Sequence, residues 1–298
     1  MMRSFNDSAF FLSNKMNNLQ SLIIGVVEGI TEFLPISSTA HMRITEGLLG
    51  IDNNDKFTKV FTIAVQMGAI LSVVFLYWKK FIQIKNPSFY SKLFIAVLPA
   101  LILGYLLGNQ IDKILEKPLV LAVIMILGGV LFLFIDKIFV DHVIDTNEKI
   151  KNSDALKIGL FQCLAVLFPG LSRSASTILG GMSLKLTRAL AAEFSFFLAV
   201  PTMAAATAYS VFVKNWNVDS EGLALAGNKI HGYELITASS ASITSFVIGN
   251  IAAFILAMLA IRFFIKFLQK NGFKLWGYYR IIAGLVTLLL IYKGYLLD

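Results

Sequence analysis

Long apolar runs separated by short polar segments dominate the chain. A transmembrane helix needs about 20 consecutive, mainly apolar residues. Six runs meet this requirement, at 58–78, 91–109, 118–135, 191–213, 239–261 and 277–295. Two further apolar stretches, 21–36 and 156–171, are each cut by a proline. The pattern predicts an all-α polytopic membrane protein, with six full spans and two broken segments in a single integral membrane domain over residues 1–298.

The composition of the chain agrees with this class. Of the 298 residues, 57% are hydrophobic and 15% are charged, and the mean hydropathy of +0.74 is well above that of a water-soluble domain. The first twenty residues lack an apolar core long enough for a cleavable signal, so we expect them to be retained. Cys163 is the single cysteine, which excludes an intrachain disulfide and a cysteine-based metal cage.

The distribution of basic residues predicts which side each loop occupies. The net charge of +8 does not indicate nucleic acid as a partner, because the basic residues gather in short loops between spans. By the positive-inside rule, the loops at 79–92 and 262–275 are cytoplasmic, which leaves 50–57, 110–117 and 214–238 outside. Each broken segment must then enter and leave the membrane on one side, the first from outside and the second from inside.

The two broken segments align with each other at one offset of 134 residues. The aligned pairs are Gly25 with Gly159, Glu28 with Gln162, Pro35 with Pro169, and Ser38 with Ser172. A shared residue bias of membrane helices is the alternative explanation. Together with the opposite side assignments, the alignment predicts an inverted-topology repeat, with halves at about 21–136 and about 155–295 and a broken re-entrant helical hairpin in each.

The breaks themselves predict a site for an anion. Pro35 and Pro169 mark them, because proline disfavours helix in the preceding residue and has no N–H to donate. The hydroxyls of Ser37–Thr39 and Ser172–Ser174 are suited to cap a new helix. Half-helix N-termini near the bilayer midplane present backbone N–H groups that bind phosphate-type anions.

Charged residues fall within or next to the apolar segments, among them Glu28, Glu32, Arg173 and Glu193. Each costs on the order of 2.5–3.5 kcal/mol in a membrane helix, so each needs a partner or a purpose. Glu28 and Glu32 are four residues apart, which places both carboxylates on one helical face. A divalent cation, Mg²⁺ or Ca²⁺, fits such oxygen ligands, and a diphosphate would supply more of them. The alternative is a structural pair that is neutralised by Arg173.

Ser38, His41 and Arg173 are the further candidates for chemistry. Ser38 and His41 are three residues apart, so a restarted helix would project both from one face and bring a nucleophile near a base. The alternative for His41 is an ordinary interfacial histidine. Arg173 lies between two serines beyond a Pro-Gly break, a setting suited to bidentate capture of phosphate oxygens. It can pair with a glutamate first and turn to phosphate when substrate arrives.

These motifs resemble the undecaprenyl-diphosphatase family, whose members are membrane enzymes linked to bacitracin resistance. The matching segments are EGITEFLPISSTAH at 28–41, PGLSRSAST at 169–177 and AAEFSFFLAVP at 191–201. The resemblance covers nearly the whole chain after about residue 20. Ala40 and Ala175 stand where the family usually has glycine, a departure that matters if a positive φ is required there.

The resemblance implies hydrolysis of undecaprenyl diphosphate to undecaprenyl phosphate and inorganic phosphate, with a divalent cation required. This reaction recycles the lipid carrier for peptidoglycan synthesis. It also implies a bacterial plasma (inner) membrane protein whose site faces outward, and the sequence leaves a homodimer open. The matching motifs give catalytic roles to Glu28, Glu32, Ser38, His41 and Arg173, and the metal to Glu28 and Glu32. With the capping hydroxyls included, we expect substrate contacts from Ser37, Thr39, Ser172, Arg173, Ser174 and Thr177. Whether Ser38, His41 or a water attacks phosphorus stays open.

Two other classes of protein compete with this interpretation. A transporter or lipid flippase shares inverted repeats and broken helices, but transport does not require a Ser/His pair or an arginine flanked by hydroxyls. The other large class of membrane lipid phosphatases has a PSGH-like segment, then Ser-Arg, then a later histidine. SSTAH is superficially similar to its first part, but the next histidine after Arg173 is His231, far outside the expected spacing.

Overall fold

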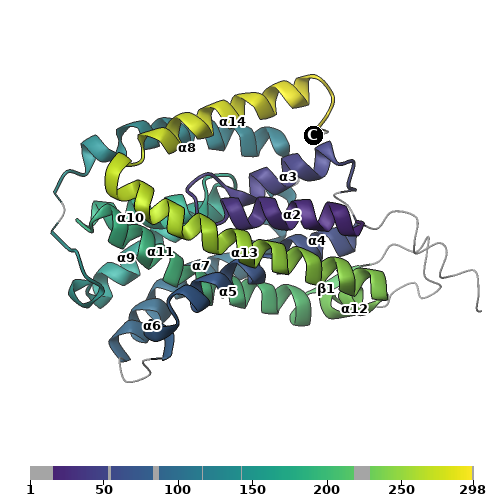
Figure 1. Ribbon diagram of the computed structural model, residues 1–298, viewed down its shortest axis with the longest axis horizontal. Helices are drawn as coiled ribbons and strands as arrows, with labels where there is room; N and C mark the ends of the chain where they lie inside the picture. Colours follow the sequence, from purple (N-terminus) through teal and green to yellow (C-terminus); the bar gives the residue numbers. More distant parts are fainter. Residues whose placement is uncertain are drawn as a thin grey trace, which may run out of the picture.

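The computed structural model describes residues 16–52, 55–82, 87–115, 117–141, 143–217 and 229–296. Most of the N-terminal segment that we expect to be retained lies outside the described residues. Figure 1 shows a bundle of helices with a small ribbon at one end, where β1 (Asn215–Asn217) pairs antiparallel with β2 (Lys229–His231). The all-α fold class predicted from the hydrophobic pattern is confirmed.

Six helices in the described part of the chain are long and apolar enough to cross a membrane, as predicted. They comprise α4 (Lys56–Ala64) continued by α5 (Gln66–Leu76), α7 (Pro87–Leu115), α8 (Pro118–Ile138), α11 (Arg188–Ala208) continued by the π-helical η2 (Tyr209–Val213), α13 (Ser240–Asn271) and α14 (Lys274–Tyr292). Large apolar side chains such as Phe94, Leu127 and Phe263 are exposed on these helices. Such exposure suits helices that face lipid.

Each broken segment folds as two helices joined by a short non-helical stretch. The first consists of α2 (Asn18–Thr31) and α3 (Ser38–Leu48), and the second of α9 (Asn152–Leu167) and α10 (Arg173–Ser183). Pro35 and Pro169 lie in the non-helical stretches, as predicted. The connections also contain α6 (Trp78–Ile82), η1 (Asn147–Lys149) and α12 (Gly232–Thr237).

The first helix of each hairpin packs against a span from the other half of the chain. α2 packs on α13, and α9 packs on α7. Both contacts depend on a glycine, because a Cβ at Gly25 would lie 2.3 Å from the carbonyl oxygen of Gly249, and one at Gly159 would lie 2.2 Å from that of Ala96. This exchange of partners supports the inverted-topology repeat, which stays a prediction.

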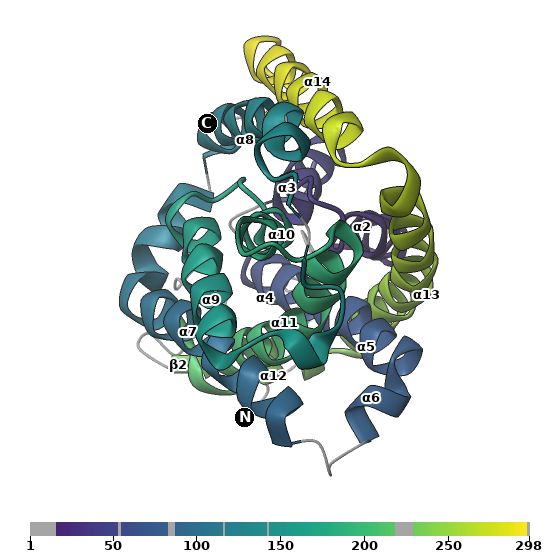
Figure 2. The ribbon, with the colours of Figure 1, turned by 90° about the vertical axis from the view of Figure 1, so that its left-hand side faces the viewer.

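The non-helical stretches lie inside the bundle. In the view of Figure 2, α10 occupies the middle of the helices, and it packs on α9 and α11. Beside the first break, the buried ring of Phe33 meets that of Phe196 edge to face, with ring centroids 5.2 Å apart. Irregular backbone at membrane depth survives only where protein or water covers it. The fold meets this condition at the first break, where residues 32–37 are buried, and at Pro169 and Gly170 of the second.

Candidate active site

A serine with positive φ begins the second helix of each hairpin. Ser37 has φ 71° and accepts a hydrogen bond from the backbone N–H of Ala40, while Ser172 has φ 80° and accepts one from that of Ala175. The predicted helix caps are confirmed. The two caps are 135 positions apart, so the structure pairs Ser37 with Ser172, one residue away from the Ser38–Ser172 pairing of the sequence alignment.

The two alanines that replace the family's usual glycines are compatible with this geometry. Ala40 and Ala175 are the third residues of their helices, and neither has a positive φ. Both are buried, and their Cβ atoms fit the surrounding core. Unusual backbone conformations occur instead at the capping serines, where an L-residue is strained and a hydrogen-bonded side chain compensates.

Arg280 of α14 joins the two breaks, and sequence reasoning missed it. Its guanidinium is fully buried and donates to the carbonyl oxygens of Pro35 at 3.0 Å, Gly170 at 3.0 Å and Leu171 at 2.9 Å. Gly128 of α8 makes room for it, because a Cβ there would lie 2.4 Å from Nη2. A charge within the apolar run 277–295 was the available signal.

A cavity of about 240 Å³ lies where the breaks meet. Six of the predicted site residues line it: Glu32, Ser37, Ser38, Thr39, Ser172 and Arg173. The rest of its wall includes apolar side chains from α7, α9 and α11, among them Ile111, Val166 and Met203. The N-termini of α3 and α10 both reach this cavity, so their partial positive charges add to that of Arg173.

Glu32 is at the centre of the polar contacts in the cavity. Its Oε2 accepts a 2.6 Å hydrogen bond from the hydroxyl of Ser38, and its Oε1 forms a 3.0 Å ion pair with Nη2 of Arg173. Nη1 of Arg173 donates to the carbonyl oxygen of Ser195 at 2.8 Å. Nε of Arg173 is buried and has no hydrogen-bond partner among the described residues. A hydroxyl, a carboxylate and a guanidinium are thus in contact at one place.

Glu28 lies behind Glu32 and does not reach the cavity wall. It is fully buried, and neither of its carboxylate oxygens has a hydrogen-bond partner within the described chain. The carboxyl groups of Glu28 and Glu32 are close enough for their charges to interact. A buried carboxylate without a partner is costly, so this pair needs a shared proton or a cation.

His41 does not bond to Ser38, the partner that the sequence predicted. Its Nδ1 donates to the carbonyl oxygen of Ser37 at 2.7 Å, and its Nε2 is 2.8 Å from the hydroxyl of Tyr279. The expected proximity to Ser38 does not become a hydrogen bond, because the Ser38 hydroxyl turns to Glu32. His41 therefore supports the start of α3 from outside the cavity lining.

Ser174 and Thr177 are not among the residues that line the cavity, and their expected contact with substrate stays a prediction. The hydroxyl of Ser174 donates to the carbonyl oxygen of Leu34, at 2.8 Å, and so connects α10 to the first break. The hydroxyl of Thr177 donates a 2.7 Å hydrogen bond to the hydroxyl of Ser195. The structure assigns these hydroxyls to holding the hairpins and Arg173 in place.

Glu193, another charged residue of the apolar segments, is not part of the cavity lining. Its carboxylate is 3.3 Å from Nζ of Lys80 and 3.3 Å from the side-chain amide of Asn147. The side chain is 25% exposed, so it lies at the edge of the bundle and not in its interior. This pair accounts for Glu193 without a role in chemistry.

Comparisons with known proteins identify the family of this chain. The family model described as bacitracin resistance protein BacA matches residues 21–286. An undecaprenyl-diphosphatase of Flavobacterium johnsoniae is 50% identical over 276 residues, which cover 92% of this chain and 96% of the relative. Proteins of the same name from Porphyromonas gingivalis and Bdellovibrio bacteriovorus are 45% and 43% identical, and each alignment covers 94% of this chain and 98% of the relative. This chain is a multi-pass membrane protein that belongs to the bacitracin resistance protein BacA family.

Proposed function

We propose that this protein hydrolyses undecaprenyl diphosphate, the lipid in the name of its relatives, to undecaprenyl phosphate and inorganic phosphate. One observation carries the proposal: Glu32 contacts both the Ser38 hydroxyl and the Arg173 guanidinium at the wall of a membrane-embedded cavity. Transport of a lipid would not require a serine hydrogen-bonded to a carboxylate. By releasing the monophosphate, the reaction returns the carrier lipid to peptidoglycan synthesis and opposes bacitracin.

Arg173 and the two helix N-termini bind the diphosphate. The guanidinium is held at one end by Ser195 and keeps an unpaired Nε donor, so it can turn from Glu32 to phosphate oxygens without losing its anchor. Backbone N–H groups at the starts of α3 and α10 add fixed positive ends at the same cavity. Donors that are already oriented stabilise the charge of the transition state at little reorganisation cost.

Ser38 attacks the terminal phosphorus. Its proton passes to Glu32, a bond forms between Oγ and phosphorus, and the bond from phosphorus to the bridging oxygen breaks, so undecaprenyl phosphate leaves. Water then attacks the phosphoserine, and the proton on Glu32 returns to the Ser38 oxygen as inorganic phosphate leaves. Glu32 is the acceptor because its Oε2 is already 2.6 Å from the hydroxyl.

Glu28 and Glu32 would hold a divalent cation, Mg²⁺ or Ca²⁺. No cluster of three or more His, Cys, Asp or Glu side chains occurs in the described residues, so the protein offers two carboxylates at most. Mg²⁺ is commonly bound by one or two carboxylates together with substrate phosphates, and the unpartnered oxygens of Glu28 suit this arrangement. A bound cation would neutralise negative charge on the phosphate oxygens.

The site opens to the outer side of the bacterial inner membrane. The proposal is supported by the basic residues of α6 and of the end of α13, which lie at the opposite end of the bundle from α12 and β1 (Figure 1). A bilayer and a lipid diphosphate are then the partners of the protein. A homodimer stays a prediction.

Purified protein in detergent should release phosphate from undecaprenyl diphosphate. Arg173→Lys keeps the charge but loses the planar fork, so we expect at least a hundredfold lower kcat/KM. Arg188→Lys is the matched control, because Arg188 pairs with Asp136 away from the cavity, and its rate should stay within about threefold of wild type. Absence of phosphate release by the wild-type protein would contradict the proposed function.

Glu32 should matter more than His41 to the chemical step. General-base contributions are about 10² to 10⁴ in rate, so we expect Glu32→Gln to lower kcat at least a hundredfold and His41→Gln about tenfold or less. Rapid-quench experiments with ³²P-labelled substrate should also trap a phosphoenzyme that Ser38→Ala lacks. A labelled phosphoenzyme that persists in Ser38→Ala would exclude attack by serine.

A chelator should abolish phosphate release, and added Mg²⁺ or Ca²⁺ should restore it. Glu28→Gln should raise the cation concentration for half-maximal rate by about tenfold, because one of two carboxylate ligands is lost. Glu193→Gln is the control, since Glu193 pairs with Lys80 far from the cavity. Full activity after exhaustive chelation would rule out a required cation.

Cysteine labelling in spheroplasts should show which way the protein is oriented. In a Cys163→Ala background, Ala238→Cys beside α12 and Ser88→Cys at the start of α7 are both at exposed positions. A membrane-impermeant maleimide should label Ala238→Cys in intact spheroplasts and Ser88→Cys only after lysis. The reverse pattern would place the site on the cytoplasmic side.

A further inference from the structure

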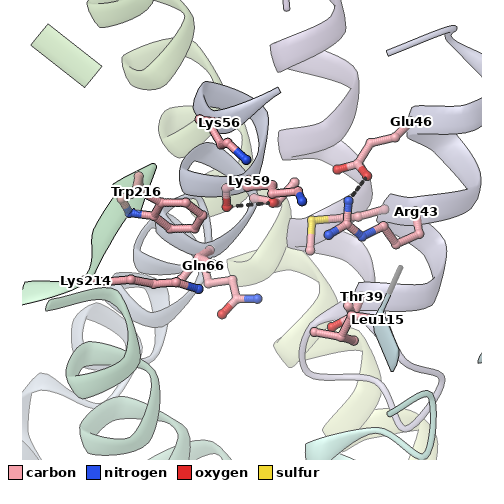
Figure 3. Close-up of a pocket in the computed structure, with 12 residues that line it drawn as sticks. Thr39, Arg43, Glu46, Lys56, Lys59, Gln66, Leu115, Lys214 and Trp216 are labelled. Carbon is pink, nitrogen blue, oxygen red and sulfur yellow. Dashed lines mark hydrogen bonds and ion pairs between the residues drawn. The ribbon is translucent and has the colours of Figure 1, made fainter. Parts of the chain in front are cut away.

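A second pocket, of about 270 Å³, adjoins the reaction cavity. Four cationic side chains line it: Arg43 from α3, Lys56 and Lys59 from α4, and Lys214 from the residue before β1. We call it the outer cationic pocket. Figure 3 shows the charged ends of Arg43, Lys59 and Lys214 directed toward a common space.

The arrangement of these cations is built into the fold. Glu46, a carboxylate among the described lining residues, is fully buried and forms a 3.0 Å ion pair with Nη1 of Arg43. Nζ of Lys214 lies 4.3 Å from the centroid of the Trp216 ring, and the indole of Trp216 is itself fixed by a hydrogen bond to the carbonyl oxygen of Ser210. These contacts hold the Arg43 and Lys214 side chains in defined positions in the lining.

Membrane topology does not account for this charge. Lys56 and Lys214 belong to segments that the positive-inside rule places outside, the side where lysine and arginine are sparse. Four cationic side chains nevertheless line this one pocket. A pocket with this lining attracts an anionic ligand.

The outer cationic pocket lies next to the reaction cavity. Thr39, Gln66 and Leu115 line both, so the two spaces share a wall at the start of α3, the start of α5 and the end of α7. The opposite part of the reaction cavity is apolar, with Val166 and Met203 in its wall, and suits a prenyl chain. A phosphate group in the reaction cavity therefore has the cationic side chains of the outer pocket as neighbours on one side.

We propose that the outer cationic pocket binds a phosphoryl anion that passes between the reaction cavity and the outside. The inference rests on the proposed function, which supplies two sources of this anion: the inorganic phosphate that leaves, and the diphosphate headgroup of the lipid that enters. Both present the same oxygens to Arg43, Lys56, Lys59 and Lys214. A cleft lined by one sign of charge raises the local concentration of such an anion.

Binding can be tested without turnover. In an Arg173→Ala background, which removes the main anion contact of the reaction cavity, inorganic phosphate should raise the melting temperature of the full-length protein in detergent. Adding Lys59→Gln and Lys214→Gln should raise the apparent Kd for phosphate about tenfold or more. Lys270→Gln, at the far end of α13, is the control and should leave Kd unchanged. The single variant Lys56→Gln repeats the test if the double variant does not fold.

An unchanged Kd in all lysine variants, or no phosphate binding in the Arg173→Ala background, would overturn the proposal. Because this measurement needs no hydrolysis, failure of the pocket and failure of the proposed enzyme activity give different results.

Steady-state kinetics then distinguishes the two sources of the anion. If the pocket receives the product, Lys59→Gln with Lys214→Gln should raise the inhibition constant of inorganic phosphate about tenfold and leave KM for the lipid unchanged. If it receives the incoming headgroup, KM for the lipid should rise and its dependence on salt should weaken. Unchanged values of both constants would contradict a role in transit.

Discussion

Arg280 holds the two broken segments together from inside the protein. Burying a guanidinium without a carboxylate partner costs on the order of several kcal/mol, and only well-placed acceptors offset that cost. The acceptors here are carbonyl oxygens that the breaks release from helical hydrogen bonding, at Pro35, Gly170 and Leu171. Each side thus satisfies the other, because the arginine needs acceptors and the breaks need a donor. The cavity exists because both stretches are held at one place.

The site is symmetric in its backbone and asymmetric in its chemistry. Both hairpins supply a helix N-terminus that is capped by a serine with positive φ. At the next position, however, the first hairpin has Ser38 and the second has Arg173, so one contributes the hydroxyl and the other the cation. Glu32 contacts both. Two similar pieces of backbone therefore provide complementary halves of a phosphoryl-transfer site.

The parts of the structure that depend on local sequence were predicted from it. Six spans follow from the length and hydropathy of each run, and the capped breaks follow from Pro35, Pro169 and the hydroxyls after them. Contacts between distant segments were not predictable in this way. Arg280 has partners in other segments, and the turn of the Ser38 hydroxyl toward Glu32 rather than His41 depends on the shape of the break.

Some of the predicted site residues line the cavity and others do not, and the difference again depends on contacts between distant segments. Residues next to the breaks, such as Ser37 and Ser172, line the cavity. Ser174 and Thr177, the second and fifth residues of α10, instead bond to groups inside the protein. A motif identifies the residue types that belong together. It does not say which side of a helix meets the ligand, because that depends on how α10 is rotated against α9 and α11.

The close contacts at Gly25 and Gly159 also have a consequence for biogenesis. α2 is among the first helices to emerge from the ribosome, yet its packing partner α13 is near the other end of the chain. The first hairpin cannot complete its packing while the second half is still being synthesised, and until then its carboxylates lack the arginines that later contact this region. Membrane insertion of this protein must therefore protect a polar, half-formed hairpin until translation is nearly finished.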